Sequence, residues 1–263
     1  MDFLALISSL FYLIATIQVS RYLFSADKQL PKVTFIPIIL ALLTHANWLY
    51  LHIFLILGNN LPILNVVSLV TFILSLLTTL VSKRLHTTIL QPLVYSFSVI
   101  TFIVAMHLPS HYITHLESHP YLGTHIILAL ISYSLLTIAS LFALQLAYID
   151  YRLKNRKSPL TTLKMPSLLT LEKTLFQFVL FGFSLLTLTL LTGFLFLDDM
   201  LTPIVAHKSI LTMIAWVIYA VLLWGHYSKG WRGKLIIYIT IAGSSLLTLA
   251  YFGSRFVREI ILA

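Results

Sequence analysis

The sequence lacks cysteine altogether, and charged residues make up only 10% of its 263 positions. Without thiols the chain can form no disulfide bond and no thiolate metal site. Soluble domains carry about 25% charged residues, so the low charge and the 59% of hydrophobic residues exclude that class of protein. No interval between the apolar runs is long enough to bury a core of its own. We therefore predict an all-α, polytopic membrane protein with no soluble domain.

Eight apolar segments approach the roughly 20 residues that a helix needs to cross the bilayer hydrocarbon. The first follows Asp2 rather than a basic region and has no small-residue cleavage site, which predicts a retained helix and not a signal peptide. We expect a single integral membrane domain over 1–263 with eight transmembrane helices. These helices are predicted at 3–19, 33–57, 63–82, 88–107, 122–148, 174–197, 208–227 and 235–254.

Lys and Arg are distributed unevenly between the two sides of this predicted bundle. Fourteen of the 17 fall in the loops that follow the first, third, fifth and seventh segments, and three fall on the other side. Cytoplasmic loops carry the excess of positive charge, so both termini are predicted to be extracytoplasmic. This topology also explains the net charge of +9, and we expect membrane lipid rather than nucleic acid as the partner of the basic residues.

Ten histidines are many for a membrane chain, and intramembrane ionisable groups usually face an interior or a cavity. His125 and His207 are predicted at the same outer depth on separate helices. Each alone indicates a structural or interfacial role, but together they provide the two axial imidazoles of a haem pocket. His45, midway along its helix, is predicted to be either a buried ligand or relay or a structural polar group that hydrogen-bonds a neighbouring helix.

The few cations on the outer side are candidates to bind the haem propionates. Lys208 follows His207, and Arg255 and Arg258 lie at the end of the eighth segment. The alternative for these residues is that they anchor helix ends by snorkelling, which is our prediction for Arg258. Trp216 is the tryptophan predicted to lie near the ligand.

Two further polar groups lie in the predicted outer loops. A spacing of four places a set of histidines on one helical face: His107, His111, His115 and His119. We predict an amphipathic cap there, with a metal-binding or haem-entry surface as the alternative. Asp198 and Asp199 are predicted to be a solvated pair, or else cation ligands or hydrogen-bond partners of a histidine.

Six stretches, in order along nearly the whole chain, carry a family resemblance: THANWLY (44–50), LNVVSLV (64–70), THIILALISYSLL (124–136), AHKSILTMIAW (206–216), GWRGK (230–234) and LAYFGSRFV (249–257). Together they resemble the CcsA-like cytochrome c assembly proteins, in their HemX-type branch. The resemblance implies an eight-helix fold in the bacterial inner membrane and a role in handling haem during cytochrome c biogenesis. The family's motif histidines coincide with His45, His125 and His207.

The chain departs from the haem-lyase members of that family in two places. They carry a tryptophan-rich WWD loop before the seventh helix and a histidine after the eighth, whereas 198–207 contains no tryptophan and no histidine follows His226. We therefore expect a non-catalytic protein that holds haem near the extracytoplasmic face, with the thiols for any thioether bond supplied by a client. The alternative is a membrane partner or regulator in divalent-metal transport or homeostasis that binds no haem. Cytochrome c assembly proteins or metal-transport proteins are the corresponding expected partners.

Overall fold

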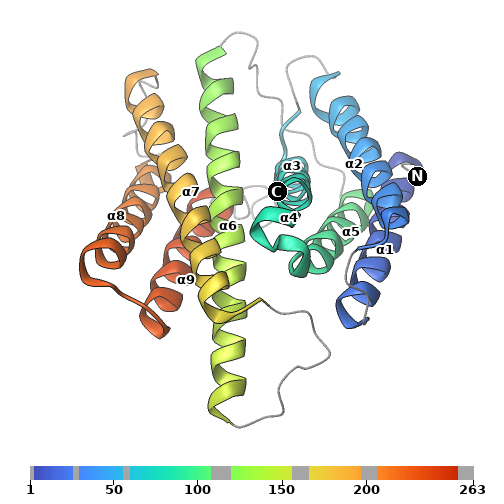
Figure 1. Ribbon diagram of the computed structural model, residues 1–263. Helices are drawn as coiled ribbons and strands as arrows, with labels where there is room; N and C mark the ends of the chain where they lie inside the picture. Colours follow the sequence, from blue (N-terminus) through green and yellow to red (C-terminus); the bar gives the residue numbers. More distant parts are fainter. Residues whose placement is uncertain are drawn as a thin grey trace. The chain divides into compact units, whose positions relative to one another are not determined.

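Helices account for nearly all of the residues that the computed structural model describes, which are 3–25, 30–55, 60–107, 120–155, 166–196 and 206–253. The chain divides into two helical units, each visible in Figure 1. The N-terminal unit comprises Met1–His115 with Ser158–Pro166, and the C-terminal unit comprises Leu116–Lys157 with Ser167–Ala263. The single membrane domain expected from the sequence stays a prediction.

Four long helices form the N-terminal unit. α1 packs against α2 and α5, and α3 packs against the same two helices, so the four close into a bundle. The long helices are α1 (Phe3–Phe24), α2 (Phe35–Leu49), α3 (Ile63–Leu80) and α5 (Gln91–His107). The shorter elements are two 3-10 turns, η1 (Lys32–Thr34) and η3 (Thr87–Ile89), the π-helical turn η2 (Tyr50–Phe54) that extends α2, and α4 (Ser82–Leu85).

The first helix turns small and polar residues inward and large apolar residues outward. Its buried residues recur every three or four positions: Ala5, Ser8, Tyr12, Ala15, Val19 and Leu23. Its exposed face carries Leu6, Leu10, Leu13 and Ile17. Lipid solvates such an apolar face, and the small inward residues let neighbouring helices approach closely. The pattern is the one expected of a helix in a membrane bundle.

Four helices form the C-terminal unit and pack in a ring, because α6 contacts α7 and α9, and α8 contacts the same two. The close approach of α6 and α7 depends on Gly182, where an added Cβ would lie 2.7 Å from Cγ of Leu136. Between α8 and α9 a Cβ on Gly243 would lie 2.8 Å from the ring of Tyr219. The helices are α6 (Pro120–Lys154), α7 (Leu168–Phe196), α8 (Ala206–Lys229) and α9 (Lys234–Thr248), which the π-helical turn η5 (Leu249–Gly253) extends.

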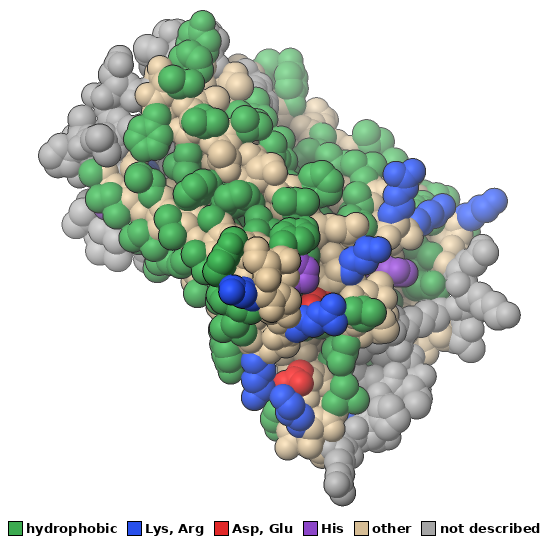
Figure 2. Space-filling model, turned by 60° about the vertical axis from the view of Figure 1, so that its left-hand side comes forward, with side chains coloured by type: hydrophobic (Ala, Val, Ile, Leu, Met, Phe, Trp, Pro, Cys, Tyr) green, Lys and Arg blue, Asp and Glu red, His purple; other side chains and the backbone are tan. Residues whose placement is uncertain are grey.

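Seven helical segments in the described part of the chain are long and apolar enough to cross a membrane. The eighth, Gln91–His107, is apolar but shorter, with 17 residues. In Figure 2 hydrophobic side chains cover large areas of the visible surface, as contact with lipid requires. The predicted all-α membrane fold is therefore confirmed. The boundaries differ most in α6, which is longer than predicted at both ends, and in α7, which begins at Leu168 rather than at 174.

Basic residues gather at one end of each unit. In the N-terminal unit the described Lys and Arg residues lie at the end of α1, the start of α2 and just after α3: Arg21, Lys32, Lys83 and Arg84. In the C-terminal unit they lie mainly at the end of α6, the start of α7 and the turn between α8 and α9, where Nε of Arg232 is 3.8 Å from Oε1 of Glu172. Lys208, in the first turn of α8, is the exception among the described residues. This arrangement matches the alternation of loops in the sequence, while the orientation of the termini stays a prediction.

Candidate functional site

His45 lies at the centre of the N-terminal unit and is fully buried. Its Nδ1 is 3.0 Å from the hydroxyl oxygen of Tyr12 on α1, and its Nε2 is 3.0 Å from Oγ of Ser68 on α3. The rings of Phe72 and Phe102 pack against it, with centroids 5.2 Å and 4.6 Å away. A neutral imidazole donates at one nitrogen and accepts at the other, so two hydroxyls satisfy both. Ligation of a metal by His45 would require one of these hydrogen bonds to break.

The hydrogen bonds around His45 belong to a longer series of polar contacts inside the same bundle. Oγ of Ser75 on α3 lies 3.2 Å from Oγ of Ser98 on α5, and Oγ1 of Thr79 lies 2.8 Å from the hydroxyl oxygen of Tyr95. Sequence reasoning singled out none of these partners. A signal was nevertheless present, because the polar residues of α3 recur at helical spacing and so share one face: Ser68, Thr71, Ser75 and Thr78.

His125 lies near the start of α6 and is half-buried. Its Nδ1 is 3.3 Å from Oγ1 of Thr192 on α7, and that hydroxyl donates its own hydrogen to the carbonyl of Thr189 at 3.0 Å. The imidazole must therefore be the donor at Nδ1. In the neutral ring Nε2 then carries the lone pair, which is the form that binds a metal ion.

His207 lies in the first turn of α8 and is exposed, while Lys208 beside it is half-buried. The depth of His207 follows from two contacts between α7 and α8, in which Trp216 lies beside Thr187 and His226 lies beside Phe176. The two helices are therefore antiparallel, and the first turn of α8 is level with the last turn of α7.

His125 and His207 thus lie at the same end of the C-terminal unit. Continuing the antiparallel pairing places His207 level with Phe196, about 6 Å along the axis, or roughly one turn, from the level of Thr192 and His125. The two histidines come from α6 and α8, which lie on either side of α7 and α9 in the ring. Both imidazoles are consequently supplied by helices and not by loops.

Trp216 is directed at α7. Its Nε1–H donates to Oγ1 of Thr187 at 2.9 Å, and its ring stacks on Phe183 with centroids 5.5 Å apart. Thr187 lies before Thr192 on α7, so Trp216 is deeper in the unit than His125 by about 7 Å. Trp216 therefore packs against α7 below the level of the two histidines.

Several predicted residues lie outside the described part of the chain: Arg255, Arg258, His111, His115, His119, Asp198 and Asp199. His107, the last residue of α5, is exposed and its Nδ1–H donates to the carbonyl of Ile103 at 2.8 Å. Within the described residues no three His, Asp or Glu side chains are grouped so that they could hold a metal ion. The described residues therefore offer no preformed divalent-metal site.

Comparison with known proteins identifies the family. The family model described as cytochrome C assembly protein matches residues 35–262. The inner membrane protein YpjD of Escherichia coli strain K12 is 45% identical to the chain over 204 residues, which are 78% of this chain and 77% of that protein, and YpjD of Escherichia coli O157:H7 matches equally. An uncharacterised 28.8 kDa protein of Azospirillum brasilense is 31% identical over 147 residues, covering 54% of this chain and 53% of that protein.

No solved structure shows significant similarity to the chain. The family match nevertheless covers all of α2 to α9, and thus both units and each of the three candidate histidines. The chain belongs to the cytochrome c assembly protein family.

Proposed function

We propose that this protein is a haem-handling membrane protein of cytochrome c assembly type, which holds haem near the extracytoplasmic end of its C-terminal unit. The observation that carries the proposal is the hydrogen bond between His125 and Thr192, because it leaves Nε2 of a half-buried imidazole as a lone-pair donor. Neutral imidazole is a common ligand of haem iron. Membership of the family supports the cofactor.

His125 and His207 would hold the haem iron in this proposal. Their levels along the unit differ by about one turn of helix, and each is fixed on a separate helix. Lys208 and Arg255 would bind the propionates, and Trp216 would contact the macrocycle from the deeper side. Thr192 would orient the ring of His125, since a hydrogen bond to the far nitrogen fixes both the tautomer and the direction of a ligating histidine.

The bound haem would supply an iron centre, and the chain itself would position and retain it. No thiol is available on the chain for a thioether bond, so a client protein would have to provide one. Because 198–207 lacks the tryptophan-rich loop of the haem-lyase members, we assign the protein a holding role and not a lyase activity. In the N-terminal unit His45, which is bonded to Tyr12 and Ser68, would act as a relay or as a gate and would ligate iron only after rearrangement.

An absorption spectrum of the detergent-purified full chain, oxidised and reduced, tests this proposal. We expect a Soret band in protein purified from cells supplied with a haem precursor. His125→Ala or His207→Ala should abolish the band or shift it to that of haem with one protein ligand. His52→Ala is a matched control, because its Nδ1–H donates to the carbonyl of Trp48 and it lies in the other unit.

Two outcomes would refute the assignment. Colourless protein under haem-replete conditions that instead retains zinc or cobalt would favour a role in divalent-metal homeostasis. A Soret band that is unchanged in both alanine variants would show that haem binds elsewhere.

A further inference from the structure

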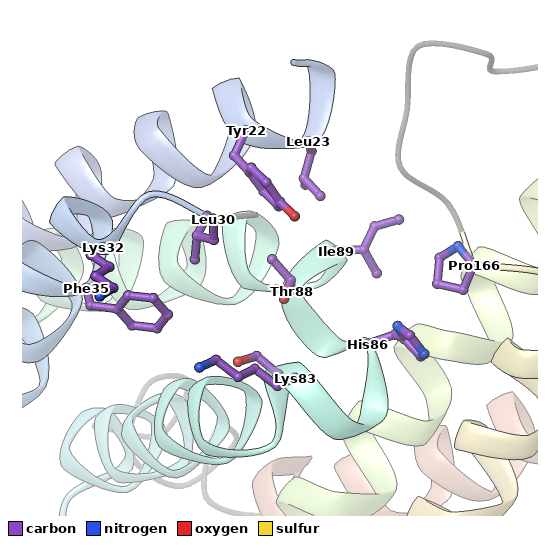
Figure 3. Close-up of a pocket in the computed structure, with 11 residues that line it drawn as sticks. Tyr22, Leu23, Leu30, Lys32, Phe35, Lys83, His86, Thr88, Ile89 and Pro166 are labelled. Carbon is purple, nitrogen blue, oxygen red and sulfur yellow. The ribbon is translucent and has the colours of Figure 1, made fainter. Parts of the chain in front are cut away.

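The basic end of the N-terminal unit contains a cavity of about 540 Å³ that the haem proposal does not use. Figure 3 shows that its walls come from the end of α1, the start of α2, and the segment from α4 to η3. The residues that line it are Tyr22, Leu23, Leu30, Lys32, Phe35, Ser82, Lys83, His86, Thr88, Ile89 and Pro166.

The cavity is cationic. Lys32 and Lys83 line it, and neither forms an ion pair with a residue that the structure describes. Arg21 and Arg84 lie on the same end of the bundle, and the described residues of this unit include no Asp or Glu. Several positive charges gathered at one opening, with no acidic side chain among the described residues of the unit, repel one another and favour an anion between them.

Of the remaining residues that line the cavity, some are polar and others are apolar. Ser82 and Thr88 supply hydroxyl groups, whereas Leu23, Leu30 and Ile89 supply aliphatic surface. A free inorganic anion would need only the polar part. An amphiphile with an anionic head would use both, and the position at the ends of membrane-length helices is where lipid headgroups lie.

His86 adds an independent observation. Its backbone is left-handed, with φ of 53°, which makes it the one non-glycine residue of positive φ in the described part of the chain. Glycine adopts this conformation without steric cost, whereas a residue with a Cβ does not. A role of the His86 ring in binding an anion in this cavity would explain why a histidine, and not a glycine, occupies this position.

We propose that this cavity binds a phosphate group, and specifically the phosphate of an anionic phospholipid. Lys32 and Lys83 contact the phosphate oxygens, and the ring of His86, which Figure 3 shows on the side of Pro166, contacts the rest of the headgroup. The aliphatic wall residues contact the start of the acyl chains. The site is distinct from the proposed haem site, because every residue that lines it belongs to the N-terminal unit.

Native mass spectrometry of the full chain, released from detergent micelles that contain a defined lipid, tests this proposal. We expect phosphatidylglycerol to remain bound and phosphatidylcholine, whose phosphate is neutralised by its own choline, to dissociate. The double variant Lys32→Ala/Lys83→Ala should weaken phosphatidylglycerol binding roughly tenfold or more, because each cation near an anionic headgroup contributes several-fold to affinity. The double variant Arg21→Ala/Arg84→Ala is the matched control, since it removes the same two positive charges from this end of the unit at positions outside the cavity lining.

His86→Gly separates binding from folding. Glycine relieves the left-handed backbone, so this variant should unfold at the same temperature as the parent or a higher one and should nevertheless bind phosphatidylglycerol more weakly. Equal retention of the two lipids, or equal losses in Lys32→Ala/Lys83→Ala and in Arg21→Ala/Arg84→Ala, would overturn the proposal. Displacement of the lipid by millimolar inorganic phosphate would overturn its assignment to a lipid, and so would a Soret band that requires His86.

Discussion

At the scale of single residues, the two buried or half-buried candidate histidines differ in what their hydrogen bonds leave available. Tyr12 and Ser68 engage both ring nitrogens of His45. Thr192 engages one nitrogen of His125. The sequence alone treats both as imidazoles within a membrane helix. Their partners make His45 a junction between three helices, and they make His125 the more available ligand.

The junction role of His45 predicts a cost in stability. His45→Ala would remove a hydrogen-bond partner from the hydroxyls of Tyr12 and Ser68 and would open a void beside Phe102, so we expect it to lower the free energy of unfolding by about 2–4 kcal/mol. Tyr12→Phe removes one hydroxyl and keeps the packing, so its cost should be about 1 kcal/mol. Unfolding of the purified chain by detergent titration measures both. A His45→Ala variant as stable as the parent would contradict this role.

At the scale of helices, hydropathy was sufficient to predict the order and approximate bounds of the apolar helices, of which seven are long enough to cross a membrane and Gln91–His107 is shorter. Hydropathy was insufficient to predict which face of each helix is buried. The mean hydropathy of an apolar segment changes little when the segment contains a few serines and threonines. The buried face of α3 is marked by Ser68, Thr71, Ser75 and Thr78, and these residues carry the contacts to His45 and Ser98. The π-helical extensions of α2 and α9 were also unforeseen, since neither has a local sequence signal.

The contact between α6 and α7 is the most extensive one that the structure describes, and it predicts a strong effect of one added methyl group. Gly182→Ala would bring Cβ to 2.7 Å from Cγ of Leu136, a fully buried side chain. Gly182 also accepts a hydrogen bond from Oγ of Ser132 at 2.8 Å through its carbonyl. Because a packed core side chain must move, we expect a loss of about 1–3 kcal/mol of stability.

Gly123 provides the control for this substitution. It lies in α6, and an added Cβ there would meet nothing within 4 Å. Gly123→Ala should therefore leave stability unchanged or raise it by up to about 1 kcal/mol, as alanine favours the helix. If Gly182→Ala and Gly123→Ala have the same melting temperature in thermal denaturation, α6 and α7 do not approach each other closely at Gly182.

At the scale of the whole molecule, the distribution of positive charge distinguishes the two ends of each helical unit. The described Lys and Arg residues gather at one end of each helical unit, with Lys208 as the exception. This charge distribution could be predicted from the sequence, because the Lys and Arg residues of each loop can be counted once the membrane segments are known. The cavity at the basic end could not be predicted from it, since that cavity forms only when α1, α2 and α4 come together.

The orientation in the membrane is directly testable because the chain has no cysteine of its own. A single cysteine can be introduced at an exposed position at either end: His107→Cys at the end of α5, Arg84→Cys beside α4, and Asn155→Cys after α6. Since the excess of positive charge stays in the cytoplasm, a membrane-impermeant maleimide should label His107→Cys in intact cells. It should label Arg84→Cys and Asn155→Cys only after permeabilisation. The reverse pattern would place the level of His125 and His207 at the cytoplasmic face, and haem would then be held on the side from which a cytoplasmic client could take it.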